Sequence, residues 1–237
     1  MIPLKRYALP NIGNFRDVGG HAARDGKMTR WGVFYRSGRL CRVTPQEAGV
    51  LKAMGIRTII DLRMSEEVEA RPDTIMEDPD LGYTAFSLMG DAAIDPEEFL
   101  RNPDESPPMA TLYLHMFQHC QAEFRVLFEM LADRVRHGAV LFHCTAGKDR
   151  TGLVAMLLQS LCGVDRLDIL ADYQISKVLN TDFLPEDTTG SDPGHMLTAL
   201  EYLDERHGGP ACFLSAIGIR DDTLGMLSDR LLGDCPL

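Results

Sequence analysis

The chain has 237 residues, of which 45% are hydrophobic and 25% charged, and its formal net charge is −11. This composition is typical of globular proteins, and the length suits one α/β domain that covers residues 1–237. The negative charge argues against nucleic acid as a partner, because the long-range field of the protein repels polyanions.

Nothing in the sequence predicts a membrane protein or an exported one. No apolar run approaches the ~20 residues that a helix needs to cross a bilayer, so we expect no stable membrane insertion. Residues 1–15 contain prolines and polar residues, whereas a signal peptide has a continuous apolar core. We therefore expect a cytoplasmic protein.

The first predicted elements are two short strands, at 32–40 and 57–63, with a helix between them. Thr44 is expected to cap this helix, and Glu47, three residues later, to complete a capping box. Residues 71–108 follow and are rich in Pro, Asp and Glu. This composition predicts loops, and we consider the segment a candidate lid or mobile insertion.

The second half of the chain is predicted to be mainly helical. Apolar residues recur at helical spacing from 111 to 135, which predicts one long helix. A buried strand is expected at 139–143 and a largely buried helix at 151–163, so that residues 144–150 form the turn between them. Three further helical patterns complete the chain, at 195–209, 210–218 and 220–233.

The turn at 144–150 has the properties of a phosphate-binding loop. Backbone N–H groups of a loop that leads into a helix converge on an anion, and the helix dipole favours negative charge there. The same field favours the thiolate of Cys144, a nucleophile, while Arg150 offers a planar fork for two phosphate oxygens. A nucleotide-binding P-loop is excluded, because no Ser or Thr follows Gly147-Lys148. The substrate-binding candidates are Thr145, Ala146, Gly147, Lys148 and Thr151.

Attack by Cys144 on phosphorus would form a phosphocysteine that water then hydrolyses. An acid must protonate the leaving oxygen, and a base must activate the water. Asp149 is the candidate inside the turn, although it could equally serve as a counter-ion to its basic neighbours. The rival acids are Asp61, Asp91 and Asp95.

Other thiol and metal chemistry has little support. The six cysteines include no C-x-x-C pair, so neither a disulfide framework nor a zinc site is indicated, and a redox protein would lack an obvious resolving cysteine. His115 and His119 lie one helical turn apart, but the periodicity turns both away from the apolar stripe, which favours exposure to solvent over metal binding. We expect no metal and no cofactor.

The segment HCTAGKDRTG, residues 143–152, resembles the signature loop of cysteine-dependent phosphatases. More narrowly, it is similar to that of the bacterial tyrosine and dual-specificity phosphatase family, which includes mycobacterial tyrosine phosphatase B. Residues 14–20 (NFRDVGG), 35–40 (YRSGRL) and 58–63 (TIIDLR) resemble N-terminal motifs of the same family. The match covers most of the chain and implies a cysteine-phosphatase-like fold, in which helices flank a central, mostly parallel sheet.

The resemblance also implies roles for the loop residues. Cys144 corresponds to the nucleophile and Arg150 to the phosphate binder, while Lys148 with Asp149 resembles the basic and acidic pair that some members use on phosphoinositides as well as phosphoproteins. By analogy with phosphoinositide phosphatases that carry an aspartate in this loop, Asp149 gains weight as the acid. Animal tyrosine phosphatases instead have a mobile acid after Trp-Pro, which is absent here because a glycine follows Trp31.

Several residues around the loop are supporting candidates. His143 either orients the surroundings of the thiolate or caps the strand. Asp61, at the end of a predicted strand, is either an acid or a hydrogen-bonding strut for the loop. Arg16, Arg36 and Arg63 either enlarge the basic site or form structural salt bridges, which are the commoner fate of arginine.

The leading hypothesis is a phosphomonoester hydrolase that acts on phosphotyrosine proteins, with phosphoserine and phosphothreonine as further substrates. One alternative is a phosphoinositide or small-molecule phosphatase on the same scaffold. The other is a non-catalytic module that recognises phosphorylated partners. The combination of Cys144, Asp149 and Arg150 argues against that module, since binding alone needs no nucleophile.

Overall fold

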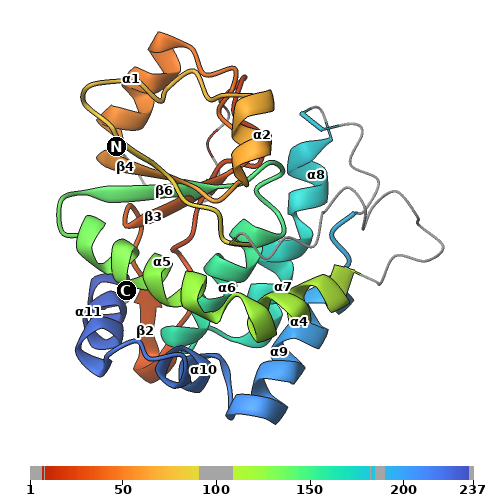
Figure 1. The fold of residues 1–237 in the computed structure, drawn as a ribbon. Coiled ribbons are helices and arrows are strands. Elements are labelled where there is room, and N and C mark those ends of the chain that lie inside the picture. Colours follow the sequence, from red (N-terminus) through yellow and green to blue (C-terminus); the bar gives the residue numbers. More distant parts are fainter. Residues whose placement is uncertain (1–6, 8, 91–108, 182, 185–189, 235–237) are drawn as a thin grey trace.

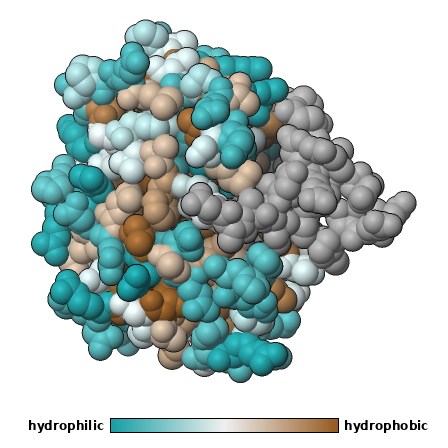
Figure 2. All heavy atoms as spheres, viewed as in Figure 1, coloured by the Kyte–Doolittle hydropathy of each residue, from teal (hydrophilic) through white to brown (hydrophobic). Residues whose placement is uncertain are grey.

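The computed structural model describes residues 7, 9–90, 109–181, 183–184 and 190–234. Within these residues, no helix combines the length and the apolar character needed to span a membrane. On the face shown in Figure 2, hydrophobic residues are interspersed with hydrophilic ones.

A five-stranded sheet forms the centre of the molecule, in the strand order β1-β3-β6-β4-β5. Strand β1 is antiparallel to β3, and all the other neighbours are parallel. The predicted α/β class with a central, mostly parallel sheet is confirmed. The strands are β1 (Arg16–Asp17), β3 (Phe34–Ser37), β4 (Ile56–Asp61), β5 (Gly82–Ala85) and β6 (Ala139–His143).

Helices cover both faces of this sheet, as Figure 1 shows, with α1 on one side and α5 and α6 on the other. A separate pair of antiparallel strands, β2 (Lys27–Thr29) and β7 (Leu232–Asp234), lies beside α11. The helices are α1 (Pro45–Ala53), α2 (Ser65–Ala70), α4 (Met109–His119), α5 (Gln121–Arg134), α6 (Arg150–Leu161), α7 (Arg166–Gln174), α8 (Ser176–Asn180), α9 (Pro193–His207), α10 (Pro210–Ala216) and α11 (Asp221–Leu231).

The central strand β6 is buried on both faces, which explains its unbroken apolar sequence. Val140 and Phe142 belong to the core beneath α5 and α6, while Ala139 and Leu141 belong to the core beneath α1. Successive side chains of a strand point to opposite faces, so one apolar run serves both cores. The ends of this strand are thereby held in place from both sides.

Helix α1 begins as predicted. Thr44 Oγ1 accepts a hydrogen bond from the Glu47 backbone N–H, and the Glu47 carboxylate accepts one from the Thr44 backbone N–H. Pro45 occupies the first helical position. Two N–H groups at the start of the helix are therefore satisfied within four residues, which is why this helix start could be predicted from the sequence.

The prediction of one long helix over 111–135 is wrong. The chain forms α4 and α5, and Cys120 between them has non-helical dihedral angles, φ −108° and ψ 31°. The apolar spacing continues through the bend because both helices turn the same stripe to one core, where the rings of Phe117 and Phe124 lie 5.5 Å apart. Periodicity does not detect a break that preserves the buried face.

Strand β5 was not predicted, and it lies within the segment for which loops were expected. Its four residues GYTA are exposed or half-buried, so they lack the apolar pattern of an inner strand. The strand pairs only with β4, at the edge of the sheet. Residues 91–108, the C-terminal part of the candidate lid, lie outside the described residues.

Candidate active site

The candidate site lies where three parallel strands end. Ser37 of β3 and Asp61 of β4 are both in register with His143 of β6. The loop 144–149 follows directly, and α6 begins at Arg150. The carboxyl edge of a parallel sheet is the usual place for ligands in α/β folds, and here the loop leaves its central strand.

Two asparagines bind the carbonyl groups of the loop. Asn14 Nδ2 donates to the carbonyl oxygens of Ala146 and Gly147, at 2.9 and 2.8 Å, and Asn180 Nδ2 donates to that of Ala146 at 2.9 Å. The C=O and N–H of a trans peptide point in opposite directions. With these carbonyls bound by the asparagines, the N–H groups of the same peptide units point away from the asparagines, as an anion-binding loop requires.

Gly147 is required by this geometry. Its φ is +64°, and a Cβ atom added to it would lie 2.2 Å from the carbonyl oxygen of Ser37. A side chain would therefore meet both backbone strain and a collision with β3.

Arg16 and Arg36 are held by Asp172 of α7. Asp172 Oδ1 lies 3.0 Å from Arg16 Nε, Asp172 Oδ2 lies 2.8 Å from Arg36 Nη1, and all three side chains are almost completely buried. Arg36 Nη2 also donates to the carbonyl oxygen of Gly147 at 2.8 Å. Burial, with repulsion from Arg16, lowers the pKa of Arg36 to about 10. The expectation of structural salt bridges is confirmed, and the pair of arginines connects α7 to the loop.

Arg150 is paired with Glu67 of α2. Arg150 Nη1 lies 2.5 Å from Glu67 Oε2, and Arg150 Nη2 lies 2.8 Å from Glu67 Oε1. Glu67 also accepts hydrogen bonds from the Thr145 hydroxyl, at 2.5 Å, and from the Met64 backbone N–H, at 3.0 Å. These bonds fix the guanidinium over the loop and use two of its five N–H donors, which leaves three for a phosphate.

The charge state of Glu67 follows from these contacts. Burial opposes ionisation, but the hydrogen bonds and the charge of Arg150, together with the Thr145 hydroxyl, lower the pKa of Glu67 to about 2. For Arg150, burial is outweighed in the same way by Glu67, and its pKa is raised. Both groups are therefore charged at neutral pH, so Glu67 has no proton to donate.

Cys144 and its neighbours in the chain are buried. The exposed fraction is 2% for Cys144 and 0% for both His143 and Thr151. His143 Nδ1 lies 3.3 Å from the carbonyl oxygen of Cys144. The Thr151 hydroxyl has no hydrogen-bond partner among the described residues, and this orphaned hydroxyl lies in the first turn of the helix that follows the loop.

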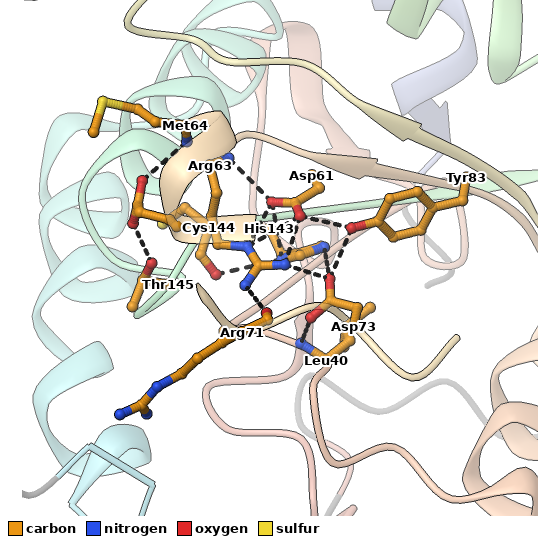
Figure 3. A network of polar contacts seen from close by, with 12 residues as sticks. Leu40, Asp61, Arg63, Met64, Arg71, Asp73, Tyr83, His143, Cys144 and Thr145 are labelled. Atoms are coloured by element: carbon orange, nitrogen blue, oxygen red, sulfur yellow. Dashed lines mark hydrogen bonds and ion pairs between the residues drawn. The ribbon is translucent and has the colours of Figure 1, made fainter. Parts of the chain in front are cut away.

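The Asp61 carboxylate is fully committed to a polar network beneath the loop (Figure 3). Arg63 Nη2 donates to Asp61 Oδ2 at 2.7 Å and lies 2.9 Å from Asp73 Oδ2. The Tyr83 hydroxyl lies 2.6 Å from Asp61 Oδ2 and 2.9 Å from Asp73 Oδ2, so that its one hydrogen faces both carboxylates. Burial opposes ionisation of Asp61, but His143, Arg63 and Tyr83 outweigh it and lower its pKa. Asp61 and Arg63 thus form a structural network, which favours the strut over the acid for Asp61.

Of the candidate acids that the structure describes, Asp149 is the accessible one. Its side chain is 21% exposed, whereas that of Asp61 is 0% exposed. Asp91 and Asp95 lie outside the described residues.

Lys148 is 1% exposed, and its Nζ donates to the carbonyl oxygen of Gly190 at 2.6 Å. The same Nζ lies 3.9 Å from Asp149 Oδ2. In this structure the lysine therefore connects the loop to the chain segment before α9.

One cluster in the described part of the chain has the composition of a metal site. The ligand atoms of Asp61, Asp73 and His143 all lie within 4.8 Å of one another. The guanidinium of Arg63 already contacts both carboxylates, so a cation is present between them. His143 Nε2 lies 3.2 Å from Asp73 Oδ2, without the alignment of a hydrogen bond.

A buried parallel strand, a loop whose carbonyls are bound by two asparagines, a buried cysteine and an arginine at the start of the next helix have the arrangement expected of a cysteine-phosphatase loop. The family model described as "Tyrosine phosphatase family" matches residues 7–233. The chain belongs to this family, and the resemblance of its motifs is confirmed.

Two relatives in sequence support the same assignment. The chain is 32% identical over 220 residues to the "Tyrosine-protein phosphatase" of Nostoc commune, an alignment that covers 84% of this chain and 74% of that protein. It is 28% identical over 275 residues to the "Triple specificity protein phosphatase PtpB" of Mycobacterium tuberculosis, which covers 95% and 98%. The crystal structure of P. aeruginosa TpbA matches with 17% identity and a TM-score of 0.45, and covers 81% of this chain and 90% of that one.

Four residues that support the loop were not identified from the sequence: Asn180, Glu67, Asp172 and Tyr113. Asn14 stood in a recognised motif, but no role was assigned to it. A polar residue at a positive φ, such as Asn14 at +56°, is a known signal of a special backbone position, but it is visible only in the structure.

Proposed function

We propose that the protein hydrolyses phosphomonoesters through a phosphocysteine on Cys144, with phosphotyrosine proteins as its principal substrates and phosphoserine and phosphothreonine proteins as further ones. The observation that carries the proposal is that hydrogen bonds from other parts of the chain fix the conformation of residues 144–150. The loop backbone is tied back by Asn14, Asn180 and Arg36, and Arg150 is oriented by Glu67. A site so pre-organised needs little rearrangement to stabilise a transferring phosphoryl group.

In the first step, the thiolate of Cys144 attacks phosphorus. The S–P bond forms while the P–O bond to the leaving group breaks, and Arg150 and the loop N–H groups share the charge on the phosphoryl oxygens. Asp149 gives its proton to the leaving oxygen.

In the second step, Asp149 takes a proton from a water molecule whose oxygen attacks phosphorus. The S–P bond then breaks and inorganic phosphate forms. The thiolate is the leaving group, and the hydroxyl of Thr151, which is buried and without a partner among the described residues, is suited to donate a hydrogen bond to it.

Two observations support protein substrates over phosphoinositides. Lys148 is 1% exposed and is bonded to Gly190, so it adds little positive charge to the surface that a headgroup would meet. The net charge of −11 opposes docking on an anionic membrane. The cytoplasmic location stays a prediction.

The test is turnover without added metal and with reductant present. The substrates are an aryl phosphate, a phosphotyrosine peptide, a phosphoserine peptide and a short-chain phosphoinositide, and the variants are Cys144→Ser and Asp149→Asn. We expect Cys144→Ser to lose all turnover but still to bind inorganic phosphate, and rapid acid quenching of the wild type to trap a phosphorylated Cys144. Turnover by Cys144→Ser would refute the mechanism, and a faster rate on phosphoinositide than on phosphotyrosine peptide would refute the substrate class.

A further inference from the structure

Asp149 has a buried partner outside the loop. The hydroxyl of Tyr113, on α4, lies 2.5 Å from Asp149 Oδ1, and it lies 2.8 Å from the hydroxyl of Tyr173, on α7. The exposed fractions of the two tyrosines are 0% and 1%. The three groups form a chain of hydrogen bonds that runs from the interior to the catalytic loop.

The direction of these hydrogen bonds is determined by their chemistry. An ionised carboxylate only accepts, so Tyr113 donates its single hydroxyl hydrogen to Asp149, and Tyr173 donates to Tyr113. Burial, together with the negative charge of Asp149, raises the pKa of Tyr113 well above its ordinary value. Tyr113 therefore remains protonated, and remains a donor, over the working pH range of such an enzyme.

Packing holds the two tyrosines in place. Their rings meet edge to face, with centroids 6.3 Å apart. Tyr173 packs on the first turn of α6, where a Cβ atom added to Gly152 would lie 3.3 Å from its Cδ2 atom. Asp149 stands at the N-cap position of α6, yet its side chain makes no capping hydrogen bond. Aspartate at this position usually caps the helix, and here its carboxylate bonds to Tyr113 instead.

We propose that Tyr113, supported by Tyr173, is a positioning residue that makes Asp149 carry and deliver its proton at Oδ2. The inference rests on the proposed role of Asp149 as the acid. With Oδ1 occupied as an acceptor, the hydrogen of the protonated carboxyl resides on Oδ2. That hydrogen passes to the leaving oxygen as the P–O bond breaks, and Oδ2 receives a hydrogen from water before the S–P bond breaks.

Tyr113→Phe removes one oxygen atom and tests this role through the pH profile. The descending limb of kcat/KM reports loss of the proton from the acid. Without the Tyr113 donor the ionised carboxylate is less favoured, so this limb should move to higher pH by about 0.5–1 unit. Tyr202→Phe is the matched control, because Tyr202 is half-buried and its ring also packs beside α4, against Phe117. The descending limb of this variant should coincide with that of the wild type.

The choice of leaving group gives a second readout. Phenyl phosphate has a poor leaving group that needs an acid, whereas p-nitrophenyl phosphate needs one much less. Asp149→Asn should therefore lose about 100-fold or more on phenyl phosphate and far less on p-nitrophenyl phosphate. Tyr113→Phe should lose about 5–30-fold on phenyl phosphate and again far less on p-nitrophenyl phosphate. In the double variant, Tyr113→Phe should not change the ratio of the two rates that Asp149→Asn shows by itself.

Failure of this inference is distinguishable from failure of the proposed function. Suppose that Tyr113→Phe keeps the wild-type pH profile and the wild-type ratio of the two leaving-group rates, while Asp149→Asn loses activity on phenyl phosphate. That result would overturn the role of Tyr113 alone. A normal ratio in Asp149→Asn would instead refute Asp149 as the acid, and activity in Cys144→Ser would refute the phosphocysteine. If Tyr113→Phe does not fold, Tyr173→Phe replaces it: a smaller limb shift in the same direction supports the inference, and an unmoved limb overturns it.

Discussion

Glu67 and Arg150 face each other through two parallel hydrogen bonds, with Nη1–Oε2 at 2.5 Å and Nη2–Oε1 at 2.8 Å. The acidic residue belongs to a six-residue helix after β4, and the arginine to the first turn of α6. An arginine side chain loses about 2 kcal/mol of rotamer entropy when it is fixed. In the proposed function, Glu67 holds the Arg150 side chain in place before phosphate binds, so part of the entropic cost of ordering Arg150 is removed from the binding step.

Replacing Glu67 with glutamine should impair catalysis. The amide offers one acceptor where the carboxylate offered two, and its NH₂ group faces the donors of Arg150. We expect kcat/KM for an aryl phosphate to fall about 10–100-fold, because a small displacement of the guanidinium weakens its hold on the transition state. Inorganic phosphate should also inhibit more weakly.

The matched control for this change is Glu66→Gln, one position earlier on the same helix with an exposed side chain. Its kcat/KM should stay within about twofold of the wild type, as surface changes usually do. Equal activities of Glu67→Gln and Glu66→Gln would contradict the role assigned to Glu67.

The Glu67–Arg150 pair should also give stability a characteristic dependence on pH. The pKa of Glu67 is lowered to about 2 in the folded state, whereas an unfolded glutamate titrates near ~4.3. A lowered pKa contributes stability that is fully present above the unfolded value and is lost as the pH falls through the folded one. The contribution at neutral pH is at most about 3 kcal/mol.

Urea unfolding of the wild type and Glu67→Gln between pH 7 and pH 3 measures this contribution. The difference in the free energy of unfolding should be constant above about pH 5.5 and should shrink below about pH 4.5. A difference that stays constant to pH 3 would show that the carboxylate charge of Glu67 does not stabilise the fold.

Gly147→Ala should abolish activity through the backbone. The new methyl group would lie 2.2 Å from the Ser37 carbonyl oxygen, at a φ of +64°. Either the loop moves away from β3 or the strain remains, so we expect a loss of about 100-fold or more in kcat/KM and about 1–3 kcal/mol in stability. Gly49→Ala is the control, since it lies within α1 with nothing inside 4 Å of the new Cβ. It should raise stability by about 0.5–1 kcal/mol without affecting turnover.

Asp172→Asn should destabilise the fold far more than a change at a surface ion pair. It leaves the buried guanidinium groups of Arg16 and Arg36 without their shared negative charge, which we expect to cost about 3–5 kcal/mol. Asp204→Asn, in the half-exposed pair with Arg166, should cost less than about 1 kcal/mol. Denaturant midpoints of the two variants compare the costs directly, and similar midpoints would show that Asp172 is not the anchor we infer.

The central strand, the turn and the following helix were all predictable from the sequence, because their signals are local. Residues 139–143 form an apolar run, the turn carries a cysteine, a glycine and an arginine within seven positions, and apolar residues resume at once. Hydrogen bonding within a helix or a turn links residues close in sequence, so its pattern is visible in a short window. The capping box of Thr44 and Glu47 was predictable for the same reason.

Only the tertiary structure shows which side chains hold the loop at 144–149. Asn14 is 133 positions from Gly147, Glu67 is 83 from Arg150, and Tyr113 is 36 from Asp149. From the sequence, an asparagine or a glutamate that faces solvent cannot be told from one that faces the loop at 144–149, because strand order and helix packing determine its partner. The sequence by itself determined which residues are the candidates for the chemistry. The parallel sheet brings the ends of β3, β4 and β6 together, and this determined which distant side chains orient the candidate residues.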